Sequence, residues 1–133
     1  MKPIKEIKTE KAPKAIGPYS QATLAGNYMF VSGQIGLDPT TNKLIHGGIK
    51  EQTKRVIENI KGILEKEGLN LSDVIKSEVY LKDLEEFKEM NDEYSSNFLD
   101  KIRPARQTVQ VARLPLDAKV EISIIAYVGD KNE

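Results

Sequence analysis

The sequence contains no cysteine, and histidine occurs once, at His46. Without cysteine there are no disulfide bonds, no thiol nucleophiles and no thiolate metal ligands. A single histidine, bordered by glycines and without a base partner, leaves no Ser-His-Asp set and no cluster of metal ligands. Catalysis by a thiol, by a serine triad or by a bound metal is therefore not expected.

An excess charge of one sign is also missing, because 20 basic and 20 acidic residues cancel. General nucleic-acid binders usually carry a basic excess, so we expect no nucleic-acid partner. The N-terminus lacks the apolar core of a signal peptide, and no apolar run approaches ~20 residues. We expect a cytoplasmic protein with no membrane partner.

The 133 residues include 39% hydrophobic and 30% charged residues. A chain of this size buries roughly two-thirds of the surface that it exposes when unfolded, which is enough for a core without metal or disulfide support. We expect a single domain over residues 1–133.

Hydrophobic periodicity and turn residues predict an α+β fold in the order β-β-α-β-α-β-β. One sheet of about six mixed strands should carry both helices on one face. The last strand is apolar on both parities, which predicts that another subunit covers the open face. The expected elements are a short edge strand within 1–15, strands 22–25 and 28–33, a helix over 49–67, a strand over 74–81, a helix from the Asp83 cap to about 99, and strands 105–113 and 119–128.

Arg106 is the most informative residue, because a permanent charge on a half-buried strand needs a partner. It shares one strand face with Thr108 and Gln110. A nearby carboxylate and an anionic ligand both remain possible partners. Glu121 follows on the next strand and is either a surface group or a general base whose pKa is raised by burial.

If strands 105–113 and 119–128 form a hairpin about Pro115, Arg106 and Glu121 lie roughly 15 Å apart along the strands. That distance is too long for both to hold one small substrate directly. A site that used both residues would need a neighbouring subunit or a substantial bend.

Asn91 interrupts a stripe at helical spacing, so its amide is either bonded locally or directed at a pocket. Tyr19 presents a phenol from a rigid loop, and Ser32 and Gly33 end a strand where backbone N–H groups can meet an anion. None of these features is specific by itself. The stripe consists of Leu84, Phe87, Asn91, Tyr94 and Phe98.

Three segments of the sequence are informative when they are taken together. They are Ile16-Gly17-Pro18-Tyr19-Ser20-Gln21, Val31-Ser32-Gly33-Gln34-Ile35, and Pro104-Ala105-Arg106 with Leu114-Pro115-x-Asp117-Ala118-x-Val120-Glu121-Ile122. In order and spacing they resemble the RidA/YjgF family of reactive-intermediate deaminases, and the match covers nearly the whole chain.

The resemblance implies a chorismate-mutase-like fold, a homotrimer with sites between subunits, and no cofactor. It implies hydrolysis of 2-imino acids or their enamines, such as 2-iminobutanoate and 2-iminopropanoate (2-aminoacrylate), to 2-oxo acids and ammonia. Pyridoxal-phosphate dehydratases would supply these imines.

The resemblance also assigns roles to residues. Arg106 would bind the substrate carboxylate and Glu121 would hold the attacking water, as a base or only by positioning it. The remaining residues would line or shape the pocket: Tyr19, Ser32, Gly33, Phe87 and Asn91. Thr108 stands where some members carry cysteine, so a thiol is not required and substrate preference can differ.

Two other functions remain open. One is a non-catalytic trimer that binds small carboxylates and regulates a partner; the presence of Arg106 favours the enzyme over it. The other is a ribonuclease or translation inhibitor, a label that some relatives carry. The balanced charge and the single histidine weigh against that activity.

Overall fold

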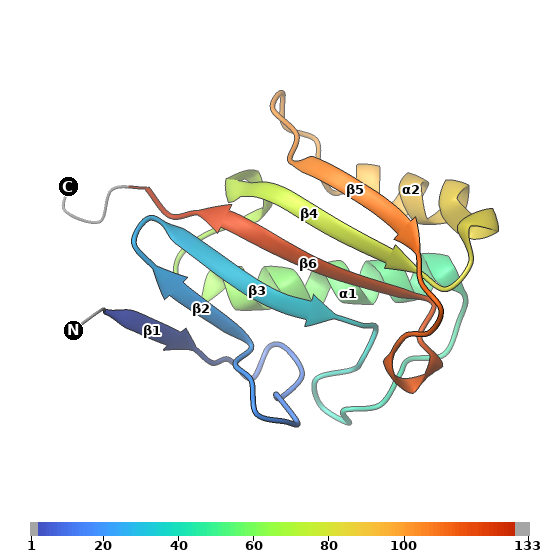
Figure 1. Cartoon of the computed structure of the whole chain (residues 1–133), viewed down its shortest axis with the longest axis horizontal. Coiled ribbons are helices and arrows are strands. Elements are labelled where there is room, and N and C mark those ends of the chain that lie inside the picture. Colours follow the sequence, from blue (N-terminus) through green and yellow to red (C-terminus); the bar gives the residue numbers. More distant parts are fainter. Residues whose placement is uncertain (1–2, 130–133) are drawn as a thin grey trace.

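Six strands form one mixed sheet in the order β1-β2-β3-β6-β4-β5 (Figure 1). The coordinates are a computed structural model that describes residues 3–129. Strands β4 and β5 are parallel, and every other neighbouring pair is antiparallel. The strands are β1 (Ile4–Ile7), β2 (Ala22–Ala25), β3 (Tyr28–Gln34), β4 (Val74–Leu81), β5 (Ala105–Gln110) and β6 (Val120–Tyr127).

Both α-helices, α1 (Ile49–Glu65) and α2 (Phe87–Ser95), lie behind one face of the sheet in Figure 1. The core fills the space between the two layers, where alternate strand residues meet the apolar helix stripes. Its fully buried members include Met29, Val79, Val120, Ile57 and Met90. The predicted α+β architecture is confirmed. Among residues 3–129, no helix is long and apolar enough to span a membrane.

Two glycines stand where the chain turns with a positive φ. Gly26 has a φ of 59° in the turn that joins β2 to β3, and Gly68 has a φ of 71° just after α1. Both values lie in the left-handed region that favours glycine. The short N-terminal strand β1 lies at the edge of the sheet, as predicted.

Strands 105–113 and 119–128 do not form the hairpin that the sequence analysis considered, so the separation of Arg106 and Glu121 derived from that pairing is wrong. Strand β5 pairs in parallel with β4, whereas β6 lies between β3 and β4. A strand that is apolar on both parities is best buried in the middle of a sheet, and a polar strand is tolerated at its edge. A short 3₁₀ turn, η3 (Pro115–Asp117), follows β5 on the way to β6.

The second helix is shorter than predicted. Asp83 does act as a cap, because its Oδ1 accepts a hydrogen bond from the Glu85 N–H at 2.9 Å. It caps a 3₁₀ turn, η2 (Leu84–Glu86), and α2 then ends at Ser95 rather than near residue 99. The remaining 3₁₀ turn is η1 (Leu71–Asp73).

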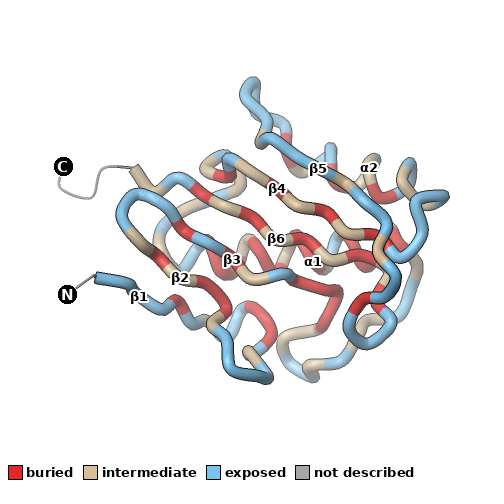
Figure 2. The backbone as a smooth tube through the Cα atoms, in the orientation of Figure 1, coloured by how far each residue is buried: buried red, intermediate tan, exposed pale blue. Residues whose placement is uncertain are grey.

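The open face of the sheet exposes large apolar side chains. Tyr28 and Tyr127 lie opposite each other with ring centroids 5.9 Å apart, and both are exposed. Phe30 and Val109 are exposed as well. Figure 2 shows intermediate and exposed residues alternating with buried ones along β3 and β6. Such a face is typical of one that a second protein surface covers.

Candidate active site

Arg106 projects from the edge strand β5 toward helix α2. It lies opposite the buried Ser77 in the β4–β5 ladder, which places it on the helix side of the sheet. Its Nη1 donates a hydrogen bond to Asn91 Oδ1 at 2.7 Å. Its Cζ lies 4.8 Å from the ring centroid of Tyr94 and 5.6 Å from that of Phe87. The guanidinium is therefore oriented by a neutral amide and two rings.

No acidic side chain neutralises Arg106 among the ion pairs of residues 3–129. Strand β5 is also more exposed than the sequence suggested, since only Thr108 on it is partly buried. Burial thus does not force a partner on Arg106. The strand presents a positioned charge at an accessible edge, which suits a carboxylate or a phosphate from outside.

The rings beneath Arg106 are themselves fixed. The Tyr94 hydroxyl donates a hydrogen bond to Ser77 Oγ at 2.9 Å, and its ring stacks on Phe98 at 4.4 Å. Burial raises the pKa of Tyr94. The buried Thr108 Oγ1 has no hydrogen-bond partner among the described residues and lies on the same strand face as Arg106.

Glu121 occupies the other face of the sheet. It lies on β6 directly opposite Tyr80 of β4, while its neighbours Val120 and Ile122 point into the core. Burial raises the pKa of the Glu121 carboxyl above its ordinary value. A carboxylate that holds its proton more tightly is a better base once ionised.

Gly33 makes room for the Glu121 carboxylate. A Cβ at Gly33 would lie 2.6 Å from Glu121 Oε2, closer than real Cβ atoms approach. The β3–β6 register shifts between Val31 and Gln34, so the ladder is irregular beside this glycine. Glycine is the residue that lets the two groups approach here.

Tyr19 and Glu121 line the same small cleft, of about 110 Å³, at the end of β3. Ser32 holds the Tyr19 loop rather than facing the cleft, since its Oγ donates to the Ser20 carbonyl at 2.6 Å. The buried Gln21 binds the preceding segment through bonds to the carbonyls of Ala12 and Pro13. The other lining residues include Gly33, Ile35, Leu37 and Leu116.

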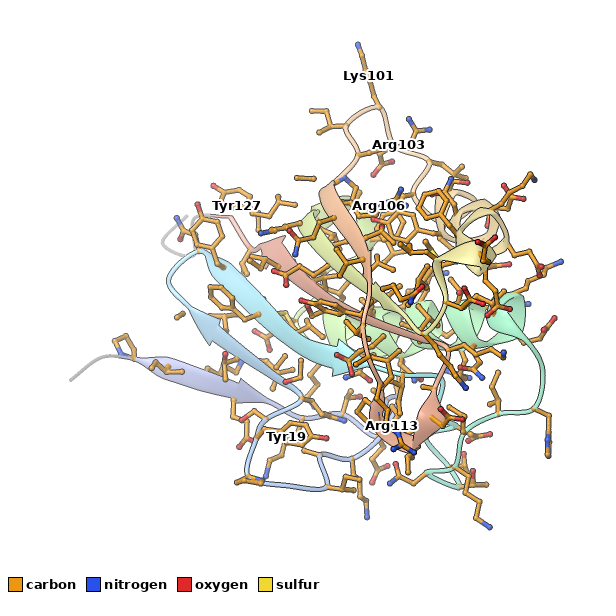
Figure 3. All side chains as sticks on the ribbon, turned by 45° about the vertical axis from the view of Figure 1, so that its right-hand side comes forward. Tyr19, Lys101, Arg103, Arg106, Arg113 and Tyr127 are labelled. Carbon is orange, nitrogen blue, oxygen red and sulfur yellow. The ribbon has the colours of Figure 1, made fainter. Side chains whose placement is uncertain are left out.

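The structure thus assembles two half-sites. One contains Arg106, Asn91, Phe87 and Thr108 on the helix side of the sheet, and the other contains Glu121, Gly33 and Tyr19 at the open face. Figure 3 shows Arg106 beside α2 at the top and Tyr19 on the N-terminal loop at the bottom. Within one chain the sheet separates the two groups, so they do not form a single pocket.

Two residues of the Arg106 half-site were missed as site residues. Tyr94 was named only as a member of the helical stripe, without a site role, and Ser77 was not singled out. The signal for Ser77 was a lone hydroxyl on the apolar parity of β4, between Ile75 and Val79, where a buried hydroxyl needs a partner.

Comparison with known proteins identifies the family. The family model described as Endoribonuclease L-PSP matches residues 9–128. The chain belongs to this family. A RutC family protein of Pyrococcus abyssi is 59% identical over 121 residues, which cover 91% of this chain and 94% of that protein. The relatives and solved structures that match include RidA proteins, so the resemblance to the RidA/YjgF family is confirmed.

Two further relatives bear on the activity within this family. The 2-iminobutanoate/2-iminopropanoate deaminase of Bos taurus is 44% identical over 125 residues, which cover 94% of this chain and 90% of that protein. The crystal structure of Escherichia coli TdcF with bound serine superposes with a TM-score of 0.87 at 41% identity, covering 92% of this chain and 98% of that one. Deaminases therefore occur among the relatives of this chain.

Proposed function

We propose that this protein hydrolyses reactive 2-imino acids and their enamine tautomers to 2-oxo acids and ammonia. Arg106 is the observation that carries the proposal, because its charge is oriented by Asn91 and two rings but not neutralised. A substrate carboxylate fits this donor fork. The name of the bovine relative supplies the substrate class, 2-iminobutanoate and 2-iminopropanoate, and TdcF binds serine, which carries the same carboxylate.

The complete site forms between subunits of a homotrimer. Arg106 and Glu121 lie on opposite faces of one sheet, so a substrate that touches both must take them from different chains. The exposed apolar residues of the open face supply a surface that a neighbouring copy can cover. This assembly would bring the Arg106 half-site of one chain to the cleft of the next.

The hydrolysis itself needs positioning and proton transfer, without an oxidation or a cofactor. The substrate carboxylate binds Arg106, and Glu121 accepts a proton as a water oxygen bonds to the imine carbon. Glu121 returns this proton to the nitrogen, which gives the neutral carbinolamine. The proton of the new hydroxyl group then moves to the nitrogen as the C–N bond breaks, so ammonia leaves and the C=O bond of the 2-oxo acid forms. The raised pKa of Glu121 suits both halves of this proton cycle.

Pyridoxal-phosphate dehydratases release imines of this class, so we place the protein beside them in the cytoplasm. The reaction would remove these intermediates before they react with other molecules.

A trapping assay tests the proposal. A threonine dehydratase generates 2-iminobutanoate, and semicarbazide captures the imine that the protein has not hydrolysed. Wild-type protein should lower the captured amount in proportion to its concentration. Unchanged trapping would contradict the enzyme and leave a carboxylate-binding regulator as the alternative. Light-scattering mass tests the assembly separately, and a monomer that retained full activity would contradict the shared site.

A further inference from the structure

Helix α1, which packs against β3 and β6, buries two amide side chains. Gln52 and Asn59 are 4% and 0% exposed, and they lie roughly two helical turns apart on one face of the helix. A buried amide costs free energy unless its hydrogen bonds are made. Neither residue takes part in the proposed hydrolysis, so their burial needs another reason.

Asn59 fixes the chain where it leaves β3. Its Nδ2 donates hydrogen bonds to the carbonyls of Ile35 at 3.3 Å and Leu37 at 3.0 Å. Its Oδ1 accepts a hydrogen bond from Arg55 Nε at 3.1 Å, which sets the orientation of the amide. The side chain is thus committed to holding segment 35–37 against α1.

Gln52 fixes the chain where it enters β6. Its Oε1 accepts a hydrogen bond from the Lys119 N–H at 2.9 Å. The Gln52 backbone also supports segment 35–37, because a Cβ at Gly36 would lie only 3.2 Å from Gln52 Cα. One helix therefore holds both the end of β3 and the start of β6.

These two anchored segments flank the Glu121 carboxylate. Lys119 lies two residues before Glu121. Ile35 lies two residues after Gly33, which makes room for that carboxylate, and the side chains of Ile35 and Leu37 line its cleft. Helix α1 lies behind the sheet (Figure 1) and Glu121 lies on the open face, so the helix acts on the cleft through the backbone.

We propose that Gln52 and Asn59 are positioning residues that fix the Glu121 carboxylate and its cleft from behind the sheet. This inference rests on the proposed deaminase function and adds which buried groups hold the geometry of its base. Gln52 acts as an acceptor and Asn59 as a donor, so the two make opposite demands on a substitution. The Arg106 half-site is separate, because the hydrogen bond and ring contacts of Arg106 are to α2.

Semicarbazide trapping at several rates of imine supply gives kcat and KM for each variant. Gln52→Met and Asn59→Leu keep the approximate side-chain volume but remove the bonds to the two segments. Each should lower kcat about 10- to 100-fold, because a small misplacement of a reacting group has an effect of this size. KM should stay within about 2-fold of the wild-type value, since the Arg106 half-site is unchanged.

Conservative variants separate the acceptor from the donor. Gln52→Glu keeps an oxygen for the Lys119 N–H in either protonation state, so it should retain most of the wild-type kcat even where burial of the carboxyl lowers Tm. As a carboxylate, the side chain of Asn59→Asp still accepts from Arg55 but has no donor for segment 35–37, so kcat should fall as in Asn59→Leu. This pair tests the role by itself if the apolar variants do not fold.

Two matched controls lie on the same helix. Thr53→Val replaces a fully buried hydroxyl whose Oγ1 has no hydrogen-bond partner among the described residues, so kcat and KM should be unchanged. Ile57→Ala removes buried apolar packing but no side-chain hydrogen bond. It should lower Tm at least as far as Gln52→Met does, while keeping kcat at temperatures well below Tm.

The outcomes distinguish this inference from the proposed function. Wild-type kcat in Gln52→Met, Asn59→Leu or Asn59→Asp, or a change in KM alone, would contradict the positioning role and leave the deaminase function intact. The role would also be wrong if Gln52→Glu or Ile57→Ala lost as much kcat, because general destabilisation would then explain the effect. Wild-type protein inactive on imines would contradict the proposed function and this inference together.

Discussion

The two half-sites are built on opposite physical principles. At β5 a permanent charge is left accessible and is oriented by uncharged neighbours, Asn91, Phe87 and Tyr94. At β6 the Glu121 carboxylate is partly removed from water, and Gly33 gives it room. The first half-site is suited to binding an anion, because the exposed guanidinium has a small desolvation penalty and no acidic side chain of the described residues neutralises it. The second is suited to moving a proton, because burial shifts its pKa toward the working pH.

The comparison assigns different kinetic roles to the two halves. Loss of the Glu121 half should lower kcat, whereas changes at the Arg106 half should appear first in substrate binding. Each of the following predictions separates the two halves by a measurement that only one of them should move.

The largest effect is expected at Glu121. Glu121→Gln keeps the shape but removes the base, so kcat should fall about 100-fold or more. In wild-type protein the activity should rise with pH through a pKa above the ordinary 4.5, because only the ionised carboxylate accepts a proton. A pH–rate profile of both proteins tests this. A wild-type profile that is flat from pH 4 to 8 would show that Glu121 only positions water.

Arg106→Ala should lower kcat/KM about 10- to 100-fold, because a charge-assisted pair contributes roughly 1.5–3 kcal/mol. Arg103→Ala is the matched control, since Arg103 lies three residues away and its Nε donates a hydrogen bond to the Phe98 carbonyl instead of to α2 side chains near Arg106. Competitive trapping measures both variants. An equal loss of kcat/KM in the two variants would mean that positive charge near β5 in general, and not the specific bond from Arg106 to the substrate carboxylate, attracts the substrate.

Asn91→Asp should raise KM about 10-fold and leave kcat nearly unchanged. The new carboxylate would lie at hydrogen-bond distance from Arg106 Nη1 and would compete with the substrate carboxylate for it. Asn91→Ala removes the orienting bond without adding a competitor, so its KM should rise less. Steady-state kinetics compare the two variants. If KM were higher for Asn91→Ala than for Asn91→Asp, the orientation of the Arg106 guanidinium, and not its unneutralised charge, would be the main contribution of this half-site to binding.

The sequence predicted the Arg106 half-site better than its surroundings. Asn91 was found because a helical repeat fixes which residues share a face, and Phe87, on the same stripe, was assigned to the site by the family resemblance. The partner strand was not found, because the pairing of β5 with β4 depends on contacts distant in sequence. The apolar character of β6 on both parities was interpreted as an open face that another subunit covers, and the proline-marked turn favoured a hairpin with β5, so the central position of β6 was not predicted.

The cleft at Glu121 was the harder part to predict. Tyr19, Gly33 and Glu121 were each singled out from the sequence, but only the family resemblance joined them into one pocket, since a phenol, a glycine and a strand carboxylate carry no joint pattern in the sequence. Their proximity follows from the pairing of β3 with β6 and from the fixed Tyr19 loop. The left-handed φ of 56° at Leu116, another residue of the cleft, was equally hidden, because leucine does not favour that conformation.

The smallest effect expected is on stability, and it tests the desolvation of Glu121 directly. A carboxyl whose pKa is raised in the folded state contributes stability that is present below its unfolded pKa, near 4.5, and is lost as pH rises through the folded pKa. Glu121→Gln lacks this loss, so relative to wild type it should be more stable at pH 7.5 than at pH 4. Denaturant unfolding at both pH values measures the difference. An equal effect at the two pH values would mean that a cation from a neighbouring subunit neutralises Glu121, and the contrast between the half-sites would then hold only for the separate chain.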